Sequence, residues 1–272
     1  MSPLDPSNLR DAAIVAASTA GAGLVGAAAL GVFHPRAMLF GPGIWRGPTQ
    51  GSAVALTFDD GPHPVYTARI AEILASHGAR GTFFCIGREL DRFPDLARAL
   101  HRSGHELANH TYRHSTGADL FISSRLVADL GQCQKVLFQI TGLSVRYYRP
   151  AIGIRNPVVH KAARRLGLTI VTWSHSARDG VFPLTPKRVR RLASQVGPGS
   201  IVALHDGATQ QSSELREQTA QNLPLLLHEL DARGLRFQTL SELLDGAPHA
   251  SFSRADSAAS GSRTNGFSGS ST

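Results

Sequence analysis

The chain has 272 residues, of which 42% are hydrophobic and 18% are charged, so it can form one large domain or two small ones with a substantial core. Its 28 Lys and Arg residues exceed its 20 Asp and Glu residues, and the net charge of +8 favours an anionic partner. No dense Lys/Arg run with interleaved aromatic residues occurs, so we expect no nucleic-acid partner. Cys85 and Cys133 are too few for a disulfide-rich scaffold. We expect two buried thiols, or one disulfide if the chain is exported.

The first element is the run Ala12–Phe33, whose 22 residues carry no formal charge and are enough to cross a bilayer as a helix. We favour an N-terminal segment, residues 1–34, that anchors the chain in a membrane. A cleaved signal peptide is an alternative, weakened because Arg10 is the only basic residue before the run. A buried helix of a soluble protein is the other. Arg36 and Arg46 follow the run, so a strict positive-inside count would place the C-terminal domain in the cytoplasm.

Three further zones follow along the chain. Residues 35–50 are rich in Pro and Gly and are expected to be a linker, and the Ser- and Gly-rich residues 247–272 are expected to be a disordered tail. Between them, residues 51–246 alternate strand-like and helix-like segments, which predicts βα units around a parallel sheet or barrel. The expected strands are Ala53–Phe58, Gly81–Ile86, Leu168–Trp173 and Ser200–Leu204. The expected helices are Tyr66–His77, Asp91–Arg102, Ser124–Thr141, Pro157–Leu166, Pro186–Val196 and Gln218–Arg233.

Two adjacent carboxylates, Asp59 and Asp60, follow the first expected strand and precede Gly61 and Pro62. Neighbouring side chains at a strand end point to opposite sides, and the two charges repel each other unless a cation neutralises them. One carboxylate can bind a metal while the other acts as a base beside the bound water. The alternative is an Asp pair that caps the following helix.

A pair of histidines, His110 and His114, has metal-ligand spacing. Residues four apart lie on one face of a helical turn, so both imidazoles can reach a single ion. The apolar lead-in Glu106–Ala108 indicates a strand that delivers the pair to the rim of a barrel. Two neutral imidazoles and one carboxylate suit zinc and leave positions for water and substrate. The alternative is a chance pair on the surface.

Three more polar residues, Arg149, Asp179 and His205, follow later apolar segments. The carboxyl end of a strand is where a barrel enzyme carries its catalytic side chains. Taken singly, His205 could be a core histidine, Arg149 a surface charge and Asp179 a loop cap. Five polar strings that each close a separate apolar segment are improbable as independent accidents, so we expect one shared site.

Together the five strings resemble the ordered motifs of the polysaccharide deacetylase family, which is the NodB-homology domain or carbohydrate esterase family four. The matching strings are TFDDGP at 57–62, NHTYRH at 109–114, YRPAIG at 148–153, the segment 173–179 and IVALHDG at 201–207. The resemblance extends over 192 residues, from Ala53 to Leu244. Five motifs in the family order are far more specific than any one of them.

The resemblance implies an α/β fold, a distorted (β/α) barrel with about seven strands, which would follow the N-terminal hydrophobic helix. It also implies a divalent metal, for which we favour Zn2+ over Co2+, Mn2+ or Ni2+. The implied metal ligands are Asp60, His110 and His114. Asp59 would be the general base, held by Arg149. His205 would be the general acid, with Asp179 as its charge partner.

Two of the motifs depart from the family pattern. The third usually reads Arg-Pro-Pro-Tyr-Gly, but Ile152 stands in the Tyr position here. The fourth usually ends in Asp-Trp, but Gly180 stands in the Trp position, and we expect Phe182 or Trp173 to take its place. These differences concern substrate preference more than metal binding or catalysis.

The resulting hypothesis is a metal-dependent enzyme that removes N-acetyl groups from N-acetylglucosamine units of a cell-wall glycan or chitin-like polymer. An O-acetyl polysaccharide esterase and a non-catalytic, membrane-tethered glycan-binding module are the alternatives. Because glycan substrates of this family lie outside the cytoplasm, we expect a membrane-anchored protein whose catalytic domain faces the periplasm or the cell surface. The protein would be secreted if the N-terminal segment is cleaved.

Overall fold

The computed structural model describes residues 32, 34–115, 117, 121–207 and 212–246. The hydrophobic run Ala12–Phe33, apart from Val32, and the C-terminal residues 247–272 lie outside this part of the chain, as do the expectations of an anchor and of a disordered tail. Among the helices of the described part, none combines the length and apolarity that crossing a bilayer requires.

A parallel sheet forms the centre of the fold, in the strand order β5-β4-β3-β2-β1-β7-β6, and β8 pairs with the start of β1. The strands are β1 Ala53–Asp59, β2 Thr82–Cys85, β3 Glu106–Asn109, β4 Tyr147–Tyr148, β5 Thr169–Ile170, β6 His175–Ser176, β7 Ile201–His205 and β8 Arg236–Phe237. The sheet curls without pairing β5 to β6, so the expected distorted barrel of about seven strands is confirmed.

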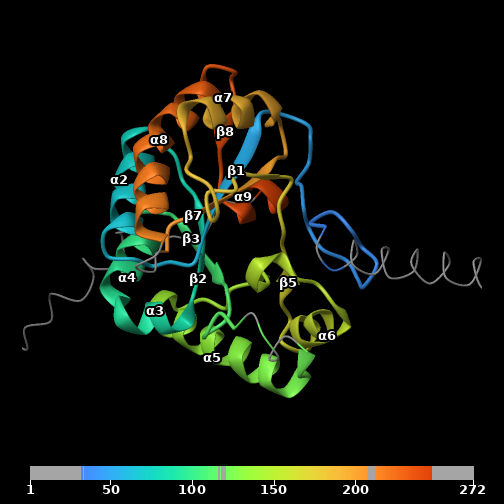
Figure 1. Ribbon diagram of the computed structural model, residues 1–272. Helices are drawn as coiled ribbons and strands as arrows, with labels where there is room; N and C mark the ends of the chain where they lie inside the picture. The colour runs from blue at the N-terminus through green and yellow to red at the C-terminus, as the bar shows by residue number, and fades with distance from the viewer. Residues whose placement is uncertain (1–31, 33, 116, 118–120, 208–211, 247–272) are drawn as a thin grey trace, which may run out of the picture.

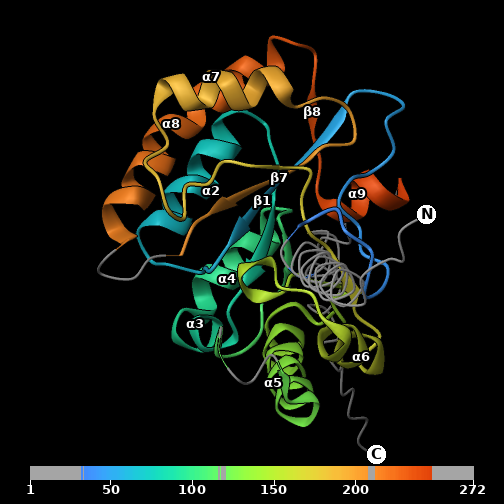
Figure 2. The same ribbon diagram turned by 45° about the vertical axis from the view of Figure 1, so that its right-hand side comes forward.

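Helices cover the outer face of this sheet, and α2, α8 and α7 lie side by side on one flank (Figures 1 and 2). The helices are α2 Tyr66–Ser76, α3 Gly87–Arg92, α4 Pro94–Arg102, α5 Ser123–Thr141, α6 Pro157–Arg165, α7 Pro186–Gln195, α8 Ser213–Asp231 and α9 Leu240–Asp245, with a 3-10 turn at Ala151–Gly153. The expectation of one helix over Asp91–Arg102 was wrong. Phe93 separates α3 from α4 with φ −131° and ψ 54°, because Pro94 disfavours a helical conformation in the residue before it.

The alternation of side chains along β1 directs Asp59, the first residue of the expected site, into the barrel. Leu56 and Phe58 belong to the outer core, against the helices, whereas Ala55 belongs to an inner core. Thr57 and Asp59 continue the inward set, because every second residue of a strand faces the same side. Asp59 therefore faces the barrel interior at the carboxyl end of the central strand.

Elements from both ends of the described chain pack against the sheet. Leu240 and Leu243 of α9 pack into the inner core, and the Leu240 amide donates to Thr82 Oγ1 at 2.9 Å. Before β1, Ile44 bridges to Val171 beside β5 and Arg46 bridges to Ser200 beside β7. The stretch for which a linker was expected thus contacts both sides of the opening in the sheet.

Candidate active site

Asp60 leaves the strand alternation and turns its carboxylate toward two histidines. Its backbone is left-handed, with φ 77°, a conformation that Asp adopts more readily than most residues. Asp60 Oδ1 lies 3.4 Å from Nε2 of His110 and 3.3 Å from Nε2 of His114. The expectation that neighbouring Asp59 and Asp60 simply point to opposite sides was wrong, because it assumed an extended backbone at both positions.

The two histidines lie in a loop after β3 and not on a helical turn. Thr111 and His114 have left-handed backbones, with φ 68° and 55°. Asn109 Oδ1 accepts from the Thr111 amide at 2.8 Å, and Thr111 Oγ1 accepts from the His114 amide at 2.9 Å. These side-chain hydrogen bonds hold the loop in a shape that local sequence spacing does not predict.

The triad of Asp60, His110 and His114 has a donor set that fits a divalent cation. One ligand atom from each residue lies within 4.8 Å of the others. The carbonyl oxygen of Arg149 can only accept a hydrogen bond, so in the neutral form of His110 the proton is on Nδ1, 2.8 Å away, and Nε2 presents its lone pair. The structure thus supplies two imidazole nitrogens and one carboxylate, the combination suited to zinc and similar metals.

The electrostatics of the triad also favour a cation. Burial raises the pKa of Asp60, but its hydrogen bond with His110, together with the positive charge that His110 and His205 carry when protonated, outweighs this effect and holds the pKa well below its usual range. Asp60 is therefore ionised. Burial and the neighbouring His110 lower the pKa of His114 to about 4, so that imidazole is neutral and able to act as a ligand.

Asp59 is held by a fully buried arginine. Arg149 Nη1 donates to Asp59 Oδ1 at 2.7 Å and to Thr57 Oγ1 at 2.8 Å, while Nη2 donates to the Thr172 carbonyl at 2.9 Å. The guanidinium also lies over the ring of Phe84, 4.1 Å from its centroid. Removing either partner would leave an uncompensated buried charge, so each partner holds the other in place.

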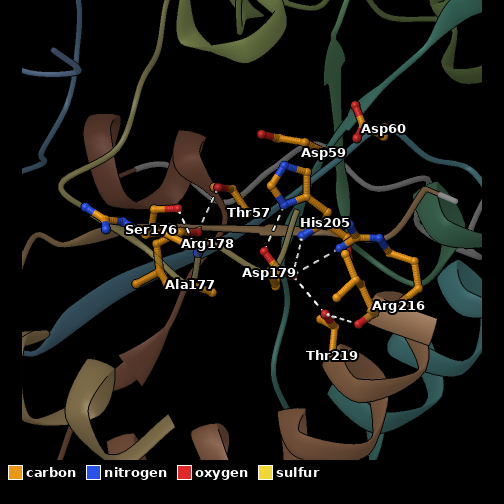
Figure 3. A network of polar contacts seen from close by, with 12 residues as sticks. Thr57, Asp59, Asp60, Ser176, Ala177, Arg178, Asp179, His205, Arg216 and Thr219 are labelled. Carbon is orange, nitrogen blue, oxygen red and sulfur yellow. Dashed lines mark hydrogen bonds and ion pairs between the residues drawn. The ribbon is translucent and has the colours of Figure 1, made fainter. Parts of the chain in front are cut away.

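His205 lies between Asp179 on one side and the Asp59–Asp60 pair on the other (Figure 3). Its Nδ1 donates to Asp179 Oδ1 at 2.8 Å, and its amide donates to Oδ2 at 3.0 Å. Burial lowers the pKa of His205, but Asp179, with smaller contributions from Asp59 and Asp60, raises it to about 9. Protonated at neutral pH, His205 can donate a proton from Nε2.

Comparison with known proteins agrees with this arrangement. Residues 46–171 match the polysaccharide deacetylase family. A chitooligosaccharide deacetylase from Azorhizobium caulinodans is 33% identical over 196 residues, which cover 70% of this chain and 93% of that protein. The chain belongs to the polysaccharide deacetylase family.

Two solved structures of this family share the fold. A peptidoglycan N-acetylglucosamine deacetylase in complex with 4-naphthalen-1-yl-N-oxidanyl-benzamide has a TM-score of 0.67 and 26% identity, covering 76% of this chain and 94% of that one. A family 4 acetyl xylan esterase from Clostridium thermocellum, in complex with a cobalt ion, has a TM-score of 0.62 and 29% identity. The match covers 70% of this chain and 89% of that one. The family therefore includes enzymes for both amide and ester substrates.

All seven residues expected at the site lie at the carboxyl edge of the deacetylase sheet, but the sequence interpretation missed their supporting contacts. Besides His205, Asp179 accepts hydrogen bonds from Thr219 Oγ1 at 2.9 Å and from Arg216 Nη1 at 3.3 Å, both on α8. The Arg216 side chain is buried, so its charge offsets that of Asp179 without solvent screening. Nothing in the spacing of α8 indicates this role, because it depends on how the helix packs against β7.

Asp206 is a second missed residue, although it lies in the motif that contains His205. It is fully buried and accepts a 2.5 Å hydrogen bond from Thr67 Oγ1. Burial and the nearby charges of Asp60 and Asp59 raise its pKa to about 7, against the lowering effect of Thr67. A Cβ on Gly61 would lie 2.0 Å from Asp206 Oδ2, so only glycine fits beside this carboxylate.

The two departures from the family motifs have distinct structural consequences. Gly180 lies against the ring of His205, since a Cβ there would lie 3.1 Å from the imidazole Cε1 and 3.2 Å from Nε2. Phe182 lies beside Arg188, and Trp173 packs against Gly153. These contacts are with residues other than Gly180, and the expectation that Phe182 or Trp173 takes the place of the family's Trp stays a prediction.

Ile152 has a strained backbone, and we expect Ile152→Gly to stabilise the fold. The residue is 60% exposed and left-handed at φ 50°, which a β-branched side chain rarely adopts. Relief of about 1–2 kcal/mol, less about 0.4–1 kcal/mol for the greater freedom of unfolded glycine, gives a net gain of up to about 1.6 kcal/mol. Urea unfolding measures it. Val181→Gly is the control: Val181 is exposed, lacks a positive φ and should only lose stability.

The Asp179–His205 pair predicts a particular pH dependence of activity. A general acid must be protonated, so the rate should fall as pH rises through the His205 pKa of about 9. In Asp179→Asn the carboxylate that raises this pKa is lost while burial still lowers it, so the fall should begin below about pH 7. Thr219→Val, which removes only one hydrogen bond to Asp179, should shift the profile much less. An unchanged basic limb in Asp179→Asn would contradict this assignment.

Proposed function

We propose that this protein hydrolyses N-acetyl groups of N-acetylglucosamine units in a polysaccharide or oligosaccharide and releases acetate. One observation carries the proposal: two ion pairs, the buried Asp59–Arg149 and the partly buried Asp179–His205, flank a triad with metal-ligand geometry. This arrangement offers a base, Asp59, on one side of the reacting group and an acid, His205, on the other. The names of the relatives support an N-acetylated glycan as the substrate.

The triad of Asp60, His110 and His114 would hold a divalent cation, and we favour zinc. When bound, the cation would act as a Lewis acid on the acetyl carbonyl and make water more acidic. The chain itself then has to position water, accept its proton and protonate the leaving group.

Asp59 is placed to accept the proton of the attacking water. Its Oδ1 is occupied by Arg149 at 2.7 Å, so Oδ2 remains as the acceptor. The hydrogen bond from Arg149 holds the Asp59 carboxylate in a fixed orientation. As water adds to the acetyl carbon, a proton passes to Asp59 and a tetrahedral intermediate forms.

His205 is placed to donate a proton to the departing nitrogen. An amide nitrogen is a poor leaving group unless it is protonated as the carbon–nitrogen bond breaks. His205 Nδ1 is bonded to Asp179, which orients the ring so that Nε2 faces the site. Protonation from Nε2 yields the free amine, and the acetyl group leaves as acetate, which completes the hydrolysis.

Acetate release from chitopentaose and from peptidoglycan, measured side by side with the full chain, tests the proposal. The protein is first stripped with a chelator and then restored with Zn2+ or Co2+. Release that requires the metal supports the deacetylase, and the better substrate indicates the glycan. A stoichiometrically metal-loaded protein that releases no acetate from either would overturn it and leave the O-acetyl esterase and the glycan-binding module.

An O-acetyl esterase is the second candidate, supported by the similarity to the acetyl xylan esterase. An alkoxide leaves more easily than an amine, so hydrolysis of an ester depends less on an acid. For an amidase we expect His205→Ala to reduce kcat by about 10²–10⁴-fold on the amide and by clearly less on acetylated xylan. A wild-type enzyme that is faster on the ester than on every amide tested would favour the esterase.

A further inference from the structure

A cavity of about 880 Å3 lies on the side of the barrel, apart from the metal triad. Its walls come from β6, from α7 and from residues 34–36, which lie beside the opening between β5 and β6. No residue of the triad lines it, nor do Asp59 and His205. The cavity is therefore a separate feature from the proposed catalytic site.

The described residues that line this cavity include several cations and no carboxylate. The cations and the two histidines beside them are Arg36, Arg178, Arg188, Arg191, His34 and His175. None of the four arginines forms an ion pair with a carboxylate of the described chain. Four like charges around one cavity repel each other, and an anion would relieve that repulsion.

Two of the arginines are held in place without being neutralised. Arg36 donates to the Ser174 carbonyl at 3.0 Å and lies over the ring of Trp45. Arg188 donates to the Ala177 carbonyl at 2.8 Å, yet its buried Nε has no hydrogen-bond partner among the described residues. The hydrogen bonds of Arg36 and Arg188 go to backbone carbonyls, so the cavity presents positive charge that is held in place and not neutralised.

The neighbouring histidine experiences the same positive potential. His175 is half-buried, and burial together with the charges of Arg36 and Arg46 lowers its pKa. It therefore stays neutral at physiological pH and adds a hydrogen-bonding group without adding to the repulsion.

We propose that this cavity binds a phosphate group. The guanidinium fork pairs with phosphate oxygens in a bidentate manner, and several arginines supply more charge than a single carboxylate would neutralise. The group could belong to an anionic phospholipid or to a soluble phosphate compound. The cavity begins at His34, directly after the uncharged run Ala12–Phe33, and this position favours a lipid headgroup.

Isothermal titration calorimetry on the full chain, solubilised in a neutral detergent, tests this proposal. The probes are inorganic phosphate, dihexanoylphosphatidylglycerol and, as a zwitterionic comparison, dihexanoylphosphatidylcholine. Arg191→Gln is the main variant, because Arg191 is exposed and its loss should not disturb folding. We expect it to weaken binding of the anionic probe about tenfold, the loss of one charge-assisted hydrogen bond.

Arg190→Gln is the matched control. Arg190 lies on the same helix, carries the same charge and is exposed, but it does not line the cavity and pairs with Glu229 instead. The affinity of Arg190→Gln for the anionic probes should stay within about twofold of the wild-type affinity, as expected for an exposed charge. Any phosphate bound at the metal triad is common to both variants and cancels in the comparison.

The possible outcomes decide whether the cavity binds phosphate and whether the phosphate group belongs to a lipid or to a soluble compound. Binding of phosphatidylglycerol that Arg191→Gln weakens supports a headgroup site, whereas binding of inorganic phosphate alone supports a soluble ligand. Equal affinity in Arg191→Gln and Arg190→Gln, or no binding of either anionic probe, would overturn the proposal. Acetate release by the same preparations tests the deacetylase independently, since no residue of the cavity belongs to the catalytic pairs.

Discussion

Replacing Asp59 with Asn is expected to lower kcat for acetate release by about 10²–10⁴-fold while the metal stays bound. Asn has the shape of Asp but cannot accept the proton of the attacking water. Asp59 is not one of the three triad residues, so a metal assay should still find one ion per chain. Acetate release and metal content are measured on the same sample.

Asp95→Asn is the control for this experiment. Asp95 is an Asp on the surface of α4 with a 96% exposed side chain, and its partner Arg98 is also accessible to water. The same chemical change there should leave kcat unchanged, because an exposed ion pair contributes little. A nearly wild-type rate in Asp59→Asn would show that another group accepts the proton. A folded variant that has lost its metal would show that Asp59 is a ligand.

The second large effect is expected for His110→Ala, which should weaken metal binding by more than about 100-fold. Loss of an outer-shell partner already costs about 10–100-fold, and His110 is proposed as a direct ligand. His110 is also 2% exposed, so the truncation leaves a cavity and can destabilise the fold. His110→Asn fills more of that space, and it too should lose the metal.

Metal affinity by competition with a chelator, together with circular dichroism, distinguishes the two effects. His77→Ala is the control, because His77 is exposed at the end of α2. It should retain the wild-type metal affinity. If folded His110→Asn binds metal as tightly as wild type, His110 is not a ligand and the triad is wrong.

Much of the fold follows from local patterns in the sequence. The apolar run before Asp59 predicts β1 almost to the residue, and the amphipathic stretch Tyr66–His77 predicts α2 to within one residue. Both patterns depend on the period of neighbouring side chains, which a chain carries irrespective of its tertiary contacts. The motifs then place the polar residues at strand ends, and parallel strands bring their carboxyl ends to one edge.

The detailed geometry of the site was decided by tertiary structure. The left-handed backbones of Asp60 and His114 contradict the extended and helical conformations that spacing alone indicates. Arg216 reaches Asp179 only because α8 packs beside β7, and Asp206 is buried only because Gly61 leaves room for it. Backbone handedness and charge partners of this kind depend on contacts far apart in the chain. A local periodicity therefore predicts where the site lies but not how its side chains meet.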